Sequence, residues 1–175
     1  MTPVEMVAAA LEVAEAGLVA GELPIGAVVV LGEEIVGRAF TQEKSRGRRL
    51  VHADLLAMTA ADEALGWGRR QGRLRLAVNL EPCVMCLGAA MTLGVSEVYY
   101  ALESPGDGGA GIAAHWRPGA DAPWLAAPQV VGGILRDRSR ELFRRYCLTA
   151  AESGMRRWAQ SLADAAPHDA SSSPS

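Results

Sequence analysis

The segment from residue 74 to residue 102 constrains the fold most strongly, because it alternates between the signals of a strand and those of a helix. The run "LRLAVNL" at 74–80 and the run "VSEVYYAL" at 95–102 have the composition of strands. The stretch between them opens with Pro82, which a first helical turn tolerates, and stops at Gly94. A helix between two strands is typical of a parallel crossover, so we expect a sheet with a parallel part.

The rest of the chain alternates in the same way. The strand-helix-strand segment at 74–102 is preceded by a helix, the two strands of a hairpin and a second helix, at 3–20, 25–31, 34–40 and 52–65. It is followed by an irregular stretch rich in Gly, Pro and Trp, a short strand and two helices, at 103–128, 129–134, 135–148 and 151–163. This order predicts one layered α/β domain over residues 1–164, with an antiparallel hairpin before the parallel crossovers. Residues 165–175 are expected to form a disordered tail.

Composition and charge exclude several classes of protein. A chain of 175 residues, 50% hydrophobic and 21% charged, suits one domain with a full core. No apolar run approaches the roughly 20 residues of a membrane span, and we expect a cytoplasmic protein without a secretory signal. Three cysteines are too few for a disulfide-stapled secreted scaffold. A net charge of −3 does not indicate a general nucleic-acid binder.

Two of the three cysteines, Cys83 and Cys86, fall in the first turn of the helix expected after the strand at 74–80. Unsatisfied amide groups and the helix dipole favour thiolates there. Thiolate pairs of this spacing bind Zn²⁺ well, and a neutral imidazole is its other preferred ligand. His52 also opens a helix and is the candidate third ligand, because two helix N-termini that meet at one end of a sheet would bring the three side chains together.

Three protein ligands would leave one zinc position open, which is characteristic of a catalytic site. A zinc ion of this kind lowers the pKa of bound water toward about 7 and makes hydroxide available at neutral pH. Asp54 follows His52 by two residues and is placed to take a proton from that water and return it to a substrate nitrogen. The sequence therefore predicts a hydrolytic zinc site with Asp54 as its proton carrier.

Three other interpretations of these residues stay open at this point. A Cys-x-x-Cys motif after a strand also describes a dithiol redox site. A closed structural zinc site needs a fourth ligand, for which Cys147, His115 and His168 are the candidates, although the sequence around Cys147 favours packing in an amphipathic helix. His52 and Asp54 also suit a helix cap followed by a first-turn carboxylate, which needs no metal.

The two motifs together resemble the zinc-dependent cytidine deaminase superfamily, whose signature is His-x-Glu followed by Pro-Cys-x-x-Cys. Here they read "HAD" and "PCVMC". The stretches "GELPIGAVVV", "HADLLAM", "LEPCVMCLGAAM" and "VVGGILRDRSRELF" are similar to the branch of bacterial tRNA adenosine deaminases and guanine deaminases, from the first helix to residue 148. The resemblance implies a three-layer α/β/α fold with a mixed five-stranded sheet. It also implies that His52, Cys83 and Cys86 hold zinc and that Asp54 takes the position of the catalytic Glu.

Two residues depart from the family pattern. Asp54 is one methylene shorter than Glu, about 1.5 Å of reach, and a misplacement of about 1 Å can lower a rate about 10²-fold. Either the pocket compensates, or the reaction is slow, or it has been lost. Thr41, in "GRAFT", replaces an Asn that contacts substrate in the family and offers one hydroxyl in place of an amide. Two changes around one pocket favour a changed substrate over random drift.

We therefore expect a zinc-dependent hydrolytic deaminase that acts on an aminopurine or aminopyrimidine base or nucleoside and releases ammonia. A small substrate is favoured over tRNA because the family Asn is absent and the chain is acidic. A tryptophan of the 103–128 stretch is expected to stack on the substrate ring. The expected substrate contacts are Thr41, Ala53, Pro82, Pro24 and Trp116.

Two alternatives to a small-molecule deaminase remain. One is a tRNA adenosine deaminase that makes inosine at the wobble position, for which basic side chains must hold phosphates. The candidates are Arg46, Arg48, Arg49, Arg144, Arg145, Arg156 and Arg157. The other is a weak or inactive relative that binds a nucleotide or RNA and keeps zinc for stability. In every case the resemblance implies a homodimer.

Overall fold

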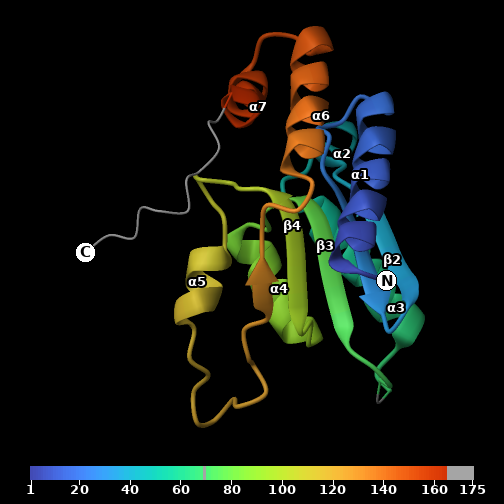
Figure 1. The fold of residues 1–175 in the computed structure, drawn as a ribbon, viewed down its shortest axis with the longest axis vertical. Helices are drawn as coiled ribbons and strands as arrows, with labels where there is room; N and C mark the ends of the chain where they lie inside the picture. The colour runs from blue at the N-terminus through green and yellow to red at the C-terminus, as the bar shows by residue number, and fades with distance from the viewer. Residues whose placement is uncertain (69, 165–175) are drawn as a thin grey trace.

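A computed structural model describes residues 1–68 and 70–164 (Figure 1). Its centre is a five-stranded sheet with the strand order β2-β1-β3-β4-β5. Strand β1 pairs antiparallel with β2 and β3, whereas β4 pairs parallel with β3 and β5. In chain order the strands span Gly26–Leu31, Glu34–Phe40, Leu74–Leu80, Glu97–Leu102 and Gln129–Val131. The predicted mixed five-stranded sheet is confirmed, whereas the tail expected at 165–175 lies outside the described residues.

Helices cover both faces of the sheet, which gives the three layers expected from the sequence (Figure 1). Helices α3 and α4 pack on one face, α1 and α6 pack on the other, and α7 packs against α6. The helices α1 to α7 span Pro3–Val19, Glu43–Arg46, Ala53–Leu65, Val84–Leu93, Ala110–His115, Arg136–Thr149 and Gly154–Asp164. Across the described part of the chain, no helix combines the length and the apolar character that crossing a membrane requires.

The helix boundaries differ from the expected ones in a few places. Helix α4 begins at Val84 because Cys83 has extended backbone and acts as the N-cap residue. Helix α7 begins at Gly154, later than expected, because the Ser153 hydroxyl accepts a hydrogen bond from the first helical turn (3.1 Å). The 103–128 stretch contains the short helix α5, and the short helix α2 lies where a polar loop is expected.

Strand β1 shows how the sheet buries both of its faces. Successive side chains of a strand point to opposite sides. Ala27 and Val29 pack on the α3 side, whereas Val28 and Val30 pack on the α1 side. All four side chains are fully buried. The uniformly apolar run "AVVV" therefore belongs to a strand that is covered on both faces.

A buried polar residue, Asn79 of β3, connects the sheet to the loop before β1. Its side chain accepts a hydrogen bond from the Gly26 amide (2.8 Å) and donates one to the Pro24 carbonyl (2.8 Å). It also donates to the Ser139 hydroxyl on α6 (3.0 Å). Asn79 has no exposed surface. The network therefore holds the loop at a fixed position between β3 and α6.

We expect Asn79→Leu to lower the free energy of unfolding by about 2–4 kcal/mol, because two buried backbone groups lose their partners. Urea denaturation followed by circular dichroism measures this change. Gln129→Leu, at an exposed position of the edge strand β5, is the matched control and is expected to change stability by less than about 0.5 kcal/mol. An Asn79→Leu variant as stable as this control would contradict the prediction.

Candidate active site

The three predicted metal ligands meet at one end of the sheet. His52 is the N-cap residue of α3, Cys83 is the N-cap residue of α4, and Cys86 lies in the first turn of α4. The Nδ1 atom of His52 lies 3.6 Å from the Cys83 sulfur and 3.7 Å from the Cys86 sulfur. All three candidate ligand atoms lie within 4.8 Å of one another. One ion can therefore contact all three.

The backbone presents these side chains without using them as helix caps. Neither His52 nor Cys83 makes a side-chain capping hydrogen bond, so the interpretation of His52 as a mere cap does not hold. The Cys83 backbone forms an antiparallel bridge with Gly108, and the next amide, of Val84, donates to the Asp107 carbonyl (3.1 Å). Two helix N-termini from separate parts of the chain thereby face one point.

Hydrogen bonds couple the two thiols and the imidazole. A hydrogen bond from the Cys86 thiol, assisted by His52, lowers the pKa of Cys83 to about 4. The hydrogen bond with Cys83 raises the pKa of His52 to about 9. Cys83 is therefore a thiolate at neutral pH, which is the form that binds metal. Two cysteine sulfurs and one imidazole nitrogen fit Zn²⁺, whose binding displaces the shared protons.

A closed structural zinc site is not supported by the other candidate ligands. Within residues 1–68 and 70–164, no fourth His, Cys, Asp or Glu joins the three at the same mutual distances. Cys147 is buried in a separate core cluster with Phe143. His115 lies on α5, where its Nδ1 is 2.8 Å from the Gly111 carbonyl oxygen. His168 lies outside the described residues.

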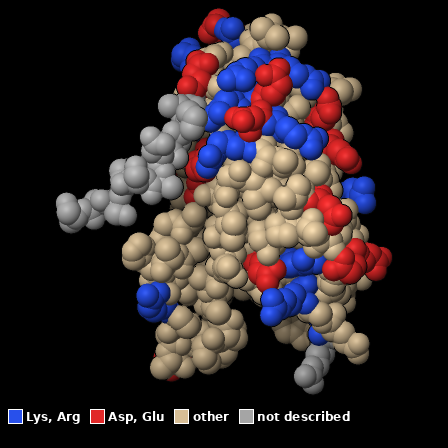
Figure 2. Space-filling model, viewed as in Figure 1, with Lys and Arg blue, Asp and Glu red and all other residues tan. Residues whose placement is uncertain are grey.

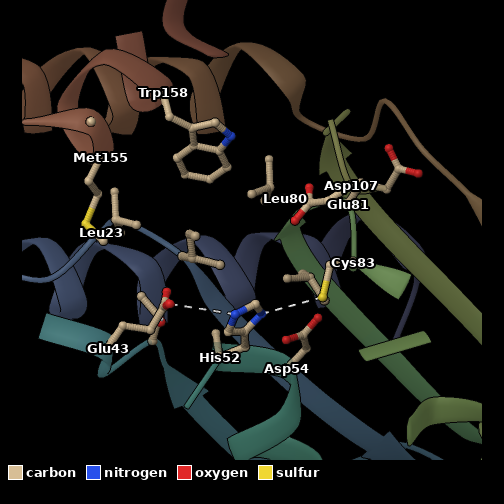
Figure 3. Close-up of a pocket in the computed structure, with 15 residues that line it drawn as sticks. Leu23, Glu43, His52, Asp54, Leu80, Glu81, Cys83, Asp107, Met155 and Trp158 are labelled. Carbon is tan, nitrogen blue, oxygen red and sulfur yellow. Dashed lines mark hydrogen bonds and ion pairs between the residues drawn. The ribbon is translucent and has the colours of Figure 1, made fainter. Parts of the chain in front are cut away.

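Asp54 lies beside the metal ligands in the first turn of α3 (Figure 3). Its side chain contacts Cys86, and its Oδ1 atom accepts a hydrogen bond from the Leu55 amide (3.1 Å). The residue is only 4% exposed, and burial raises the pKa of its carboxyl group. A raised pKa brings the carboxyl closer to the neutral range, where a proton carrier works best.

Two of the candidate metal ligands, His52 and Cys83, line a cavity of about 340 Å³. Leu23, Ile25 and Leu80 contribute apolar walls, and Met155 and Trp158 of α7 cover the side opposite His52 (Figure 3). The polar and sulfur-bearing residues around the cavity are Thr41, Glu43, His52, Asp54, Glu81, Cys83 and Asp107. This volume lies in the range of small-molecule sites, of about 300–1,000 Å³.

Two of the five expected substrate contacts line this cavity, namely Thr41 and Ala53. The Thr41 hydroxyl is buried and lies 3.2 Å from the Val51 carbonyl oxygen and 3.3 Å from a Glu43 carboxylate oxygen. Local partners therefore already engage the hydroxyl that replaces the family Asn.

The other three expected contacts do not line the cavity. The Pro24 carbonyl is the acceptor for Asn79 and faces the core network. Pro82 is buried, and its carbonyl accepts the Gly109 amide (2.9 Å). The Trp116 indole donates to the Leu125 carbonyl (2.8 Å) within the stretch between α5 and β5. In this structure these three residues therefore lie outside the cavity lining.

Sequence reasoning missed the aromatic residue that does line the cavity, Trp158. Its ring meets Phe143 of α6 edge-on, with centroids 6.2 Å apart. The periodicity of the sequence predicts which side of α7 is apolar, but it does not predict which part of the protein that side packs against. Glu43, Glu81 and Asp107 were also missed, because single carboxylates in polar loops carry no spacing signal.

Comparison with known proteins gives the family. The profile described as "Cytidine and deoxycytidylate deaminase zinc-binding region" matches residues 2–102, which include all three metal ligands. The chain belongs to this deaminase family. The resemblance expected from "HAD" and "PCVMC" is confirmed, and so is the expected Zn²⁺ cofactor, which the cluster of His52, Cys83 and Cys86 fits.

The curated relatives include a tRNA-specific adenosine deaminase of Bacillus subtilis. It is 41% identical over 91 residues, which cover 52% of this chain and 56% of that protein. The chain thus spans just over half the length of this relative. The fold is also similar to a solved structure from a study of tRNA:A34 deaminases, with a TM-score of 0.68, 29% identity, and coverage of 79% of this chain and 98% of the other.

A second solved structure with this fold is a guanine deaminase from Nitrosomonas europaea. The TM-score is 0.66 at 25% identity, over 83% of this chain and 84% of that chain. The two structures, of a tRNA-directed enzyme and of a base-directed enzyme, resemble this chain to nearly the same degree. Overall similarity therefore does not decide the substrate.

Proposed function

We propose that the protein is a zinc-dependent hydrolytic deaminase that acts on an aminopurine or aminopyrimidine base or nucleoside. In this reaction a water oxygen forms a bond to the amine-bearing ring carbon, and the bond between that carbon and the exocyclic nitrogen breaks. The products are a ring carbonyl and ammonia. Zinc, when bound by His52, Cys83 and Cys86, supplies the Lewis acidity that makes water nucleophilic at neutral pH.

Asp54 moves the protons in this proposal. Its carboxylate takes one proton as water attacks and passes it to the ring nitrogen beside the reacting carbon. It then takes the second proton of the former water from the new hydroxyl group and delivers it to the departing amine, as the hydroxyl becomes the ring carbonyl. The raised pKa of the buried carboxyl favours both uptake and release. The hydrogen bond from the Leu55 amide and the packing of the first α3 turn hold the carboxyl group in place.

The observation that carries the proposal is that a cavity of base size is lined by His52, Cys83 and Asp54, with Cys86 directly behind in the same metal-ligand cluster. The test is ammonia release from adenine, guanine, cytosine, their nucleosides and a tRNA anticodon stem-loop, with zinc content measured on the same sample. We expect turnover of at least one base or nucleoside. Zinc-loaded protein that turns over no member of this panel would favour the non-catalytic binding alternative.

Deamination of tRNA is the second candidate function, because relatives with that activity are similar to this chain. The arginines expected to hold phosphates give it less support. Arg145 pairs with Glu15 (2.7 Å), Arg144 lies 3.5 Å from Glu141, and Arg156 pairs with Glu152. Figure 2 shows basic side chains interleaved with acidic ones on the α1 and α6 face. Arg46, Arg48, Arg49 and Arg157 are exposed.

Trp158 is proposed to form the wall against which the substrate ring lies. We expect Trp158→Ala to raise KM about 10-fold or more, since an aromatic contact of this size contributes about 1.5–3 kcal/mol. Trp158→Phe should restore most of the affinity. Steady-state kinetics measure both, with Trp124→Ala as the control because Trp124 is 75% exposed. A rise in KM in the control as large as in Trp158→Ala would contradict this role.

We also propose a homodimer through the outer side of α4. Val84 is half-exposed, and Gly88 and Thr92 follow at intervals of four residues on the same exposed side. Light scattering after size exclusion should give twice the mass of the chain. Gly88→Glu, which places a charge at the centre of this side, should shift the mass toward that of one chain. A wild-type protein of single-chain mass at all concentrations would contradict the proposal.

A further inference from the structure

We infer that Asp107 selects a substrate that carries no phosphate, by presenting a carboxylate to a hydrogen-bond donor or positive group of the bound molecule. This inference rests on the proposed function and concerns the same cavity. It names a specificity-determining residue that does not take part in proton transfer. The argument depends on the charge of the cavity, on which carboxylates are already engaged, and on how firmly Asp107 is held.

The charged side chains around the cavity are almost all acidic. Glu43, Asp54, Glu81 and Asp107 line it, and His52 is a metal ligand. Among the residues that the structure describes, no Lys or Arg lines it. A phosphate is normally bound by such cations or by free backbone amides. A nucleotide in this cavity would instead bring its negative charge close to carboxylates.

Glu81 is already engaged by the protein, because each of its oxygens accepts a backbone amide. One accepts from Ser104 (3.0 Å) and the other from Ala110 (2.9 Å). Glu43 lies against Thr41, and its other oxygen is 3.7 Å from the His52 Nε2 atom. These two carboxylates thus stabilise the protein around the site. Because Glu43 and Glu81 are engaged in this way, Asp107 is, besides the proton carrier Asp54, the remaining carboxylate that can contact the substrate.

Asp107 is held in a way that suits this role. Its Oδ1 atom accepts a hydrogen bond from the Ser104 hydroxyl (2.6 Å). In the described part of the chain, its second oxygen has no donor within hydrogen-bond distance. The residue is exposed as a whole and yet lines the cavity. A carboxylate with one oxygen fixed and the other open can accept a hydrogen bond from a ligand without reorganising.

The loop that carries Asp107 is fixed at several points. The Asp107 carbonyl accepts the Val84 amide (3.1 Å), and the Gly108 amide donates to the Ser104 carbonyl (2.9 Å). A Cβ atom at Gly108 would lie 2.3 Å from the Glu81 carboxyl carbon, so the loop packs directly on Glu81. Because Gly108 also bridges to Cys83, Asp107 keeps a constant position relative to the metal ligands.

The end of the cavity opposite Asp107 is also negatively charged, because Glu43 lies there. Figure 3 shows Glu43 and Asp107 on opposite sides of His52, with Trp158 and Met155 above. This arrangement offers apolar surface to a flat ring and the open oxygen of Asp107 to one edge of that ring, while the engaged Glu43 adds negative charge at the other end. A neutral or positively charged aminated ring fits it, whereas a phosphate group at either end meets like charge.

The test measures selectivity between matched pairs of substrates. The pairs are adenosine, guanosine and cytidine, each against its 5′-monophosphate, together with an anticodon stem-loop RNA. For any nucleoside that is turned over, we expect kcat/KM at least about 10-fold above that of the monophosphate. Asp107→Asn should lower the ratio of the two kcat/KM values several-fold. Asp107→Lys should lower it further, because a positive charge at this position raises kcat/KM for the monophosphate. The kcat for the nucleoside should change less than its KM.

Asp121→Asn and Asp121→Lys are matched controls, since Asp121 is exposed in the stretch after α5 and does not line the cavity. Zinc content of all variants should equal that of the wild type, and Asp107→Asn, which keeps an acceptor for the Ser104 hydroxyl, should also keep the wild-type unfolding temperature. A wild-type protein with a higher kcat/KM for a monophosphate or for the RNA than for the nucleoside would overturn the inference. An Asp107→Lys variant with the same nucleoside-to-monophosphate ratio of kcat/KM as Asp121→Lys would also overturn it.

Failure of the proposed function gives a different result. In that case no nucleoside, base or RNA releases ammonia. Calorimetric titration with inosine, xanthosine and uridine, each against its 5′-monophosphate, then tests the inference without turnover. Tighter binding of the nucleosides, lost in Asp107→Lys but kept in Asp121→Lys, would support phosphate exclusion, and equal binding of both members of every pair would overturn it.

Discussion

Asp54→Asn is expected to lower kcat/KM for ammonia release by about 10²- to 10⁴-fold, the range contributed by a positioned general acid and base. The amide has nearly the shape of the carboxyl group, and its oxygen can still accept the Leu55 amide (3.1 Å). It cannot take up and return a proton. The loss should therefore appear in kcat, with zinc content and stability close to the wild-type values. Coupled detection of ammonia measures it.

Asp54→Glu separates an adapted enzyme from a relative that has lost the reaction. A site shaped around Asp54, which is buried against Cys86, should lose rate when the side chain is lengthened by about 1.5 Å. A non-catalytic module would stay inactive or gain activity. Glu63→Gln, on the exposed side of the same helix, is the control and should have no effect. Asp54→Asn with the activity of this control would remove Asp54 from the mechanism.

The metal site was predictable because residue types that bind metal occur there at short, characteristic spacing. Two cysteines three residues apart and an imidazole at a helix start are uncommon for packing reasons, and they suit one metal. The strand and helix signals then place both helix N-termini at one sheet end. What the spacing does not give is the position of each ligand in its helix. Cys83 turned out to be the N-cap residue because its backbone is extended.

The substrate side of the cavity was less predictable, because long-range packing forms it. Trp116 is the expected aromatic contact because it lies in the irregular 103–128 stretch, whereas Trp158 lies in a predicted helix and is not singled out. Only the packing of α7 on α6, with Phe143 against Trp158, brings the second one to the cavity. Asp107 reaches the cavity through a loop fixed on Glu81, and neither residue has a periodic signal. Groups of reactive residues at short spacing can therefore be predicted from the sequence. The residues that line the substrate side of the cavity cannot, because tertiary contacts bring them together.

Cys86→Ser is expected to lower zinc affinity by at least about 100-fold, because loss of a supporting group beyond the ligands already costs about 10- to 100-fold. The wild type should bind close to one zinc per chain, since the three candidate ligand atoms of His52, Cys83 and Cys86 lie within 4.8 Å of one another. Ammonia release should fall with the zinc content. Elemental analysis and competition with a zinc chelator measure the affinity.

Cys147→Ser is the matched control, because Cys147 is also a buried free thiol but lies in a separate core cluster. It should keep its zinc and its activity while losing some stability from burial of a hydroxyl. Zinc bound to the folded state also stabilises it by mass action, so a chelator should lower the melting temperature of the wild type and of Cys147→Ser. Cys86→Ser should not respond. Full zinc retention by Cys86→Ser, or loss of zinc from Cys147→Ser, would contradict the assignment of the ligands.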